Sequence, residues 1–169
     1  RDRPGVHPRI AMSLNNTQKD LIRKTWKIVE DGGLKEAGMV MFIKLFEDNP
    51  HFIPLFNFAD KQTVEELKHS DRLARHATGV MKTVAVAVEN LDEPGAIQSP
   101  LHDLGGRHYN YKIQPEYFQP VGAALLYALE QRTGEAFTEE AKQAWVEVFG
   151  VVSDTMKGGF HSRAASKGQ

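Results

Sequence analysis

Two histidines lie where an imidazole could bind a metal, because each falls on the apolar face of a predicted helix. Leu101, Leu104 and His108 are spaced by three and four residues, which places them on one side of a helix. An imidazole buried there without a partner would destabilise the fold by about 1–3 kcal/mol. His108 must therefore form a hydrogen bond within the core, which is the more common outcome, or coordinate a metal.

His76 occupies a similar position on a second amphipathic segment. It follows Leu73 by three residues and precedes Val80 by four, so it shares their apolar face. Two imidazoles from separate helices suit a metal or a metal-bearing macrocycle, because neutral imidazole is a good ligand for iron. A zinc site is less favoured, since the sequence has no cysteine and no His-Glu-x-x-His pair to supply further ligands.

The composition describes an ordinary single domain with no strong charge. The 169 residues include 21 Lys and Arg against 22 Asp and Glu, which gives no reason to expect nucleic acid or a membrane surface as a partner. The absence of cysteine excludes disulfides and thiol chemistry. No apolar run is long enough to span a bilayer, and no signal-peptide core is visible, so we expect a cytoplasmic protein.

Apolar residues recur at helical spacing along most of the chain, and no strand-like alternation competes with them. The sequence therefore predicts an all-α fold of about six major helices joined by short helical pieces. The expected helices cover residues 15–31, 34–48, 70–89, a segment carrying His108 after a turn at 91–95, 115–132 and 138–157. We expect a flexible tail at 1–13, one domain at 14–160 and a second tail at 161–169.

Local signals mark several ends of these helices. Asn15 and Gln18 have the spacing of a capping box, and Ser70 and Thr138 are suited to cap later helices. The pair Gly158-Gly159 is expected to end the last helix. Three glycines within helices, Gly38, Gly79 and Gly122, favour close helix crossings.

These residues resemble the globin family in their order and spacing over roughly residues 14–160. His76 and His108 are 32 residues apart, which matches the usual spacing of distal and proximal histidines. The other matching features are Trp26, the run Met-Phe-Ile-Lys-Leu-Phe at 41–46, Pro50, Pro-Leu-Phe at 54–56, Val80 and Leu-Gly-Gly-Arg-His at 104–108. Arg-His-Tyr-Asn-Tyr at 107–111 makes the chain most similar to the neuroglobin and globin X members of the family.

The resemblance implies a globin fold that holds haem b, iron protoporphyrin IX. It implies His108 as the proximal iron ligand, with its second nitrogen bonded to a carbonyl near Leu104, and His76 as the distal histidine. Phe56 would wedge against the porphyrin. The remaining expected contacts are Phe42, Phe58, Val80, Leu104, Ile113, Phe118 and Val121, all of which could instead be ordinary core residues, and Lys112 as a partner of a haem propionate.

The chain departs from neuroglobin at two positions near the expected propionates. Gly79 stands where neuroglobin has a lysine, and Phe58 stands where it has a tyrosine. Lys112, Arg72 and Arg75 are the remaining candidates to pair with the propionates. We therefore predict that the helix carrying His76 is less tethered than in neuroglobin.

The resemblance implies reversible binding of O₂, CO and NO, with no dedicated catalytic residues. His76 would either donate a hydrogen bond to bound O₂ or ligate the iron itself; the resemblance favours bis-histidyl iron at rest, although spacing alone does not choose. One alternative is a haem redox enzyme, such as an NO dioxygenase or nitrite reductase, or an electron-transfer protein, with a separate reductase or electron-transfer partner. Another is a haemless helical signalling module. The other histidines, at 7, 51, 69, 102 and 161, are expected to face solvent.

Overall fold

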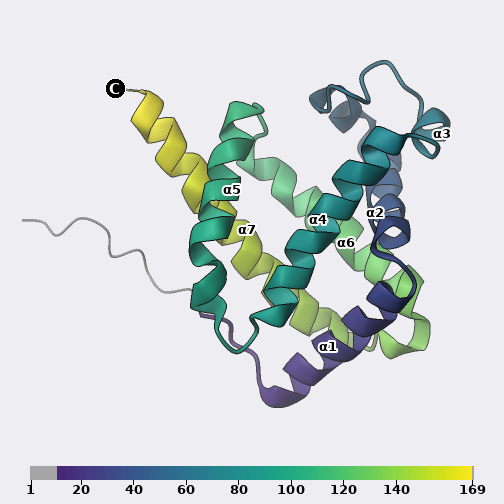
Figure 1. The fold of residues 1–169 in the computed structure, drawn as a ribbon, viewed down its shortest axis with the longest axis vertical. Helices are drawn as coiled ribbons and strands as arrows, with labels where there is room; N and C mark the ends of the chain where they lie inside the picture. The colour runs from purple at the N-terminus through teal and green to yellow at the C-terminus, as the bar shows by residue number, and fades with distance from the viewer. Residues whose placement is uncertain (1–10, 169) are drawn as a thin grey trace, which may run out of the picture.

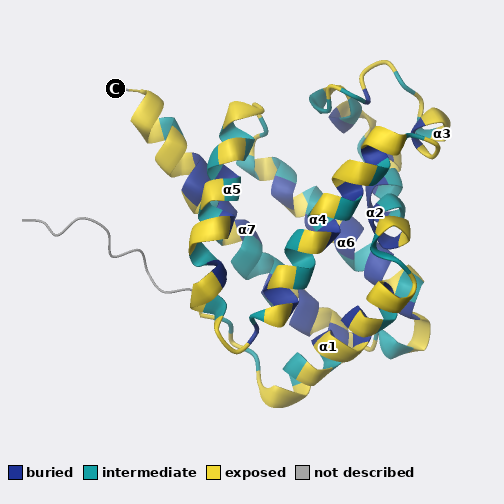
Figure 2. Cartoon of the chain, in the orientation of Figure 1, coloured by how far each residue is buried: buried dark blue, intermediate teal, exposed yellow. Residues whose placement is uncertain are grey.

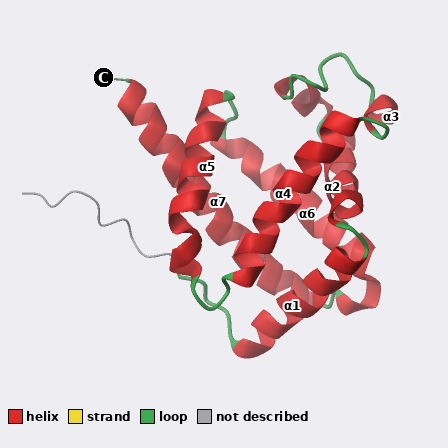
Figure 3. Cartoon of the chain, in the orientation of Figure 1, coloured by secondary structure: helices red, strands yellow, loops and turns green. Residues whose placement is uncertain are grey.

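The computed structural model describes residues 11–168, and over this range the chain is helical without any strand (Figures 1 and 3). The all-α prediction is confirmed. The α-helices are α1 (Asn16–Asp31), α2 (Leu34–Asp48), α3 (Val64–Leu67), α4 (Asp71–Glu89), α5 (Gln98–Asn110), α6 (Phe118–Thr133) and α7 (Glu139–Lys167). Short 3₁₀ segments cover Pro50–Leu55, Pro94–Ile97, Pro115–Tyr117 and Gly134–Ala136. No helix in the described range is long and apolar enough to cross a bilayer.

Side-chain caps fix the starts of α1, α4 and α7 as the sequence predicts. Asn15 Oδ1 accepts a hydrogen bond from the Gln18 amide at 2.8 Å, and Gln18 Oε1 accepts one from the Asn15 amide at 3.0 Å. Ser70 and Thr138 each accept a bond from an amide three residues later. Each cap satisfies an amide that the helix leaves free, and contributes about 1 kcal/mol.

The helices pack through their apolar faces, which are buried on the inside of the molecule (Figure 2). In the view of Figure 1, α4 and α5 lie in front of α6 and α7. The most extensive contacts join α5 to α7 and α2 to α4. At the junction of α1 and α7, the rings of Trp26 and Trp145 have centroids 5.9 Å apart, and Trp145 Nε1 donates to Thr25 Oγ1 at 2.9 Å. This junction anchors one end of the molecule.

The C-terminal helix extends beyond its predicted end. The prediction that Gly158-Gly159 ends it is wrong, because α7 continues to Lys167 and neither glycine has the positive φ of a C-cap. Gly159 is buried where α5 crosses α7, and a Cβ on it would overlap the carbonyl oxygen of His102. The glycine therefore permits a close crossing, and the expected tail from residue 161 is helical up to Lys167.

Gly105 makes the matching contact from the α5 side of this crossing. A Cβ there would overlap the backbone oxygen of Met156, and backbone atoms cannot rotate away as a side chain can. We expect Gly105→Ala to lower the free energy of unfolding by at least about 1–3 kcal/mol, the usual effect of overpacking. A lower urea midpoint would show this.

Gly150→Ala is the matched control, because Gly150 lies within α7 and has no atom near the added methyl. It should raise the free energy of unfolding by about 0.5–1 kcal/mol through the higher helix propensity of alanine. Equal urea midpoints for the Gly105 and Gly150 variants would contradict the close crossing.

The other glycine predictions have mixed outcomes. Gly38 lies against α4, where a Cβ would sit 2.8 Å from the Ala77 carbonyl oxygen, so this predicted close crossing is confirmed. A Cβ built on Gly122 would overlap the ring of Phe149 on α7, so this predicted close crossing is confirmed as well. Gly79 has no atom within 4 Å of an added Cβ, so the prediction that it marks a close crossing is wrong.

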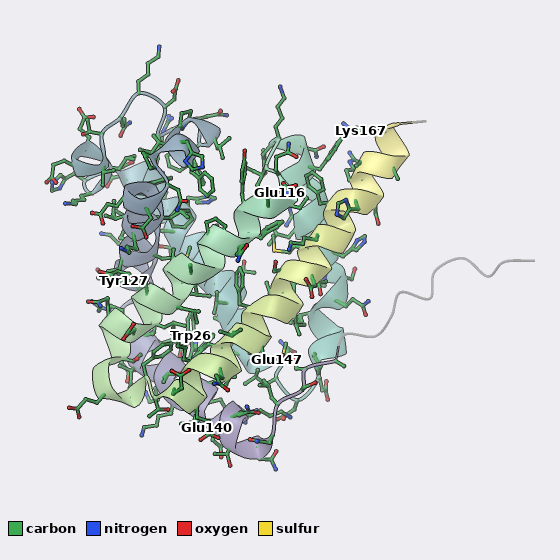
Figure 4. The ribbon with its side chains drawn as sticks, turned by 180° about the vertical axis from the view of Figure 1, so that it is seen from behind. Trp26, Glu116, Tyr127, Glu140, Glu147 and Lys167 are labelled. Atoms are coloured by element: carbon green, nitrogen blue, oxygen red, sulfur yellow. The ribbon has the colours of Figure 1, made fainter. Side chains whose placement is uncertain are left out.

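The N-terminal segment is attached to the domain from residue 12 onwards. Met12 packs against the core, and the Ser13 amide donates to Glu147 Oε1 on α7 at 3.0 Å (Figure 4 labels Glu147). The expected tail at 1–13 therefore extends too far at its end, and its residues 1–10 lie outside the described residues.

His102 also differs from the prediction. It is half-buried, and its Nε2 lies 3.3 Å from Ser162 Oγ on α7, so it belongs to the α5–α7 contact. His51, His69 and His161 are exposed as expected, whereas His7 is outside the described range.

Candidate functional site

His108 lies in the last turn of α5, and a single hydrogen bond fixes its ring. Its Nδ1 is 2.8 Å from the carbonyl oxygen of Leu104, one turn earlier on the helix. Because a carbonyl can only accept, Nδ1 carries the proton and Nε2 keeps a free lone pair. The bond that the globin resemblance implied is confirmed, and it leaves Nε2 available to a metal.

His76 lies in the second turn of α4, beside three phenylalanine rings. The centroid of its ring is 5.2 Å from that of Phe42, 5.4 Å from Phe56 and 5.8 Å from Phe58. These rings come from α2 and from the segment that follows it. His76 makes no hydrogen bond to any residue within 11–168, although its ring stays accessible. The sequence of this region therefore places three phenylalanine rings beside one solvent-accessible imidazole.

The surroundings favour the neutral form of both rings. Apolar neighbours lower the pKa of His76 below the usual value for histidine, and the charge of His108 lowers it further. The pKa of His108 is also lowered, by burial first and by Arg107 second, while the Leu104 carbonyl opposes the shift. Both therefore present neutral nitrogens, the form that binds iron.

The ligand-free chain is expected to lose stability as the pH falls below about 6.5, the ordinary histidine pKa. Because both folded-state pKa values are lowered, the unfolded chain binds more protons than the folded chain below that pH. The contribution of the two neutral rings to the free energy of unfolding is therefore complete above about pH 6.5. It is lost as the pH falls through their lowered pKa values. Urea midpoints at neutral and acidic pH measure the change. A double His76→Leu, His108→Leu variant should show a smaller decrease, and an equal decrease would contradict the assignment.

The remaining predicted residues lie either beside the His108 ring or against the hydrophobic core. On the His108 side, the Phe118 ring at the start of α6 has its centroid 5.9 Å from that of His108 and is buried. The predicted residues Val80, Leu104, Phe56, Phe58 and Val121 are half-buried and pack against the core. Ile113 is half-buried after α5, and its amide donates to the His108 carbonyl at 3.3 Å. The predicted apolar residues thus come from four helices, α2, α4, α5 and α6, and from two connecting segments, one after α2 and one after α5.

Lys112 is the predicted residue that the structure connects least to the site. It is exposed in the turn after α5, with φ of 59°, and makes no ion pair within residues 11–168. Tyr111, by contrast, was missed as a site residue. Its ring is 65% exposed, and its centroid lies 6.3 Å from that of His108. The three-residue step from His108 to Tyr111 was the available signal, since it places both on one side of a helix.

The donor set fits haem iron better than a bare metal ion. No group of three or more His, Cys, Asp or Glu side chains within residues 11–168 is placed to hold an ion. Two imidazoles can complete a metal site only if the remaining ligands come from a macrocycle, and axial histidine ligation is typical of haem. An all-α fold that offers two neutral imidazoles fits the class of helical haem proteins.

Comparison with known proteins identifies the family within this class. The family model described as Globin matches residues 40–156, and the chain belongs to the globin family. Globins are a family of haem proteins that bind small gas ligands such as O₂. The sequence is 30% identical over 155 residues to the neuroglobins of Tetraodon nigroviridis and Danio rerio, covering 91% of this chain and 97% of each relative. The predicted resemblance to neuroglobin is confirmed.

A solved structure supports the fold. The crystal structure of a hexacoordinated haem protein from an anhydrobiotic tardigrade, at pH 4, superposes with a TM-score of 0.82. The match covers 89% of this chain and 97% of the tardigrade chain, at 23% sequence identity. At that identity the likeness shows the globin fold alone.

Proposed function

We propose that this globin holds haem b between His108 and His76 at rest, and that O₂, CO or NO binds when His76 moves away. Bound haem supplies the iron on which the gas ligand binds. His108 acts as the proximal ligand, with its ring oriented by the Leu104 carbonyl. His76 would provide a second, reversible ligand from α4. The suggested role is gas storage, sensing or redox signalling.

The observation that carries this proposal is the difference in hydrogen bonding between the two rings. His108 is fixed by a 2.8 Å bond, whereas His76 has only ring contacts with Phe42, Phe56 and Phe58. Moving His76 therefore breaks no hydrogen bond within the described chain. Van der Waals contacts with aromatic rings are individually weak and can be exchanged as a ring rotates.

The surroundings of α4 also support movement of His76. No atom lies within 4 Å of a Cβ built on Gly79, three residues after His76, so no neighbour packs against that point of the helix. The side chains of Thr78 and Thr83 bond to carbonyls one turn back, which tends to bend a helix. These features favour movement of the His76 side chain, whereas the helix itself is held against α2, where Gly38 packs closely on Ala77.

Competition between His76 and gas ligands would set the apparent affinity. If the histidine-bound state is favoured by about 100-fold, the apparent affinity for a gas falls by that factor, equivalent to about 2.7 kcal/mol. The same state would also keep the iron coordination nearly constant between oxidation states. This suits the second candidate function, electron transfer with a separate partner protein, for which the exposed Tyr111 ring beside His108 offers a contact.

The absorption spectrum of the deoxygenated ferrous protein tests the proposal. We expect sharply split bands without added ligand, the sign of six-coordinate iron, and conversion to a gas-bound spectrum under CO. The spectrum of the haem in alkaline pyridine checks that it is haem b. A single broad band in the ferrous protein would overturn six-coordination, and a colourless protein that takes up no added haem would favour the haemless alternative.

A further inference from the structure

A pocket of about 390 Å³ opens between the end of α2 and the start of α6. We call it the α2–α6 groove. Figure 4, which views the molecule from the side opposite to α4 in Figure 1, labels Glu116 beside the start of α6. None of its lining residues is a predicted contact of the haem. They are Leu45, Asp48 and Asn49 at the end of α2, and Glu116, Gln119, Pro120, Ala123 and Ala124 at the start of α6.

Small side chains on α6 create the hollow. Ala123 and Ala124 leave open the space that longer side chains would fill opposite Leu45. Leu45 and Ala124 are buried and form an apolar floor, whereas Ala123 is exposed. Sites for small organic molecules usually have volumes of about 300–1,000 Å³. The groove is therefore large enough for a short organic molecule.

The two charged side chains that line the groove are both carboxylates. Glu116 is exposed and makes no ion pair with any residue in the range 11–168. Asp48 pairs with Lys44 through Oδ1 at 3.1 Å, and a carboxylate can accept more than one such bond. Asn49 Nδ2 donates to the Leu45 carbonyl at 3.1 Å, which leaves Asn49 Oδ1 as a further acceptor. The groove thus offers several acceptors above an apolar floor.

An ammonium group of the chain itself already binds beside this groove. Lys44 Nζ, besides its contact with Asp48, lies 4.9 Å from the centroid of the Tyr127 ring on α6. An aromatic face attracts a cation through its quadrupole. The C-terminal end of α2, which lies at the groove, carries partial negative charge and acts in the same direction. This face of the molecule therefore favours a positively charged head group.

From the cavity and its acceptors we propose that the α2–α6 groove binds a short aliphatic amine in its protonated form. The hydrocarbon chain contacts Leu45, Ala123 and Ala124, and the ammonium group donates to Asp48 and Glu116. An anion would be repelled by both carboxylates, and a metal ion would leave the apolar floor uncovered. The volume holds a free amine entirely. A lysine side chain of another protein carries the same head group, so the experiment compares both sources.

Amide chemical shifts of the haem-loaded protein measure the binding of hexylammonium, 1-hexanol and Nα-acetyl-lysine methylamide. The protein is saturated with CO beforehand, so that the amine cannot bind at the iron. We expect hexylammonium to perturb Leu45 and Ala124, and to bind roughly tenfold more tightly than hexanol through two exposed charge pairs. Added salt should weaken this preference, because salt screens exposed charges. The lysine derivative should bind more weakly than hexylammonium.

Two variants separate the charge of the groove from its shape. The double variant Asp48→Asn, Glu116→Gln should lower the affinity for hexylammonium to that for hexanol and leave hexanol binding unchanged. Ala123→Leu should prevent binding of both ligands by filling the hollow, and the fold should tolerate it because Ala123 is exposed. Glu130→Gln is the matched control. It removes an exposed carboxylate near the other end of α6 and should change neither affinity.

Four outcomes would contradict the proposal. Equal affinities for hexylammonium and hexanol at low salt would remove the role of the carboxylates, and so would full amine binding by the double variant. Unchanged binding to Ala123→Leu would place the ligand elsewhere. Equally tight binding of the lysine derivative would assign the groove to a protein side chain instead of a free amine. None of these results depends on iron coordination by His76, so they are distinct from a failure of the proposed function.

Discussion

Replacing His108 with glycine is expected to abolish stable haem binding, and added imidazole is expected to restore it. The glycine variant loses the one nitrogen that the 2.8 Å bond to the Leu104 carbonyl holds in place. Loss of a supporting partner alone lowers metal affinity by about 10–100-fold, so loss of the ligand itself should have a larger effect. Free imidazole can enter the vacated space and supply an equivalent nitrogen.

The measurement is the haem absorbance that the protein retains after gel filtration, with and without imidazole. His69→Gly is the matched control, because His69 is an exposed histidine before α4 that makes no contact with either ring. It should retain haem fully. A His108→Gly variant that holds haem without imidazole would show that His108 is not the proximal ligand.

Replacing His76 with leucine is expected to convert the ferrous protein from six- to five-coordinate while haem stays bound. Leucine fits among the three phenylalanine rings around His76, since it replaces an imidazole that makes no hydrogen bond there. Without an internal competitor, the apparent affinity for CO should rise by roughly 100-fold if the histidine-bound state is favoured to that extent.

The ferrous spectrum and the CO titration report this change together. A broad single band should replace the split bands in His76→Leu, whereas His69→Leu should keep the spectrum of the parent protein. His76→Gln adds a useful comparison, because an amide can donate a hydrogen bond to a bound gas without competing strongly for iron. If His76→Leu leaves the ferrous spectrum unchanged, His76 is not the sixth ligand.

The sequence by itself determined the helices and the local geometry of the site. Helical spacing of apolar residues and the caps at Asn15, Ser70 and Thr138 placed most helix ends, because these signals act within one turn of the chain. The bond from His108 to the Leu104 carbonyl was implied by the globin resemblance, and it is local as well, since the two residues are one turn apart. The order and spacing of the histidines, aromatic residues and prolines along the chain also identified the globin family.

Only the tertiary structure decided the features that depend on which helices meet. A pair of glycines can end a helix or permit a close crossing, and the position of α5 against Gly159 selected the crossing. The close contact between Gly105 of α5 and the Met156 backbone of α7 likewise has no signal in either segment alone. Local hydrogen bonds and periodicity are fixed by neighbours in the chain, whereas cavities and crossings are fixed by surfaces that come together only on folding.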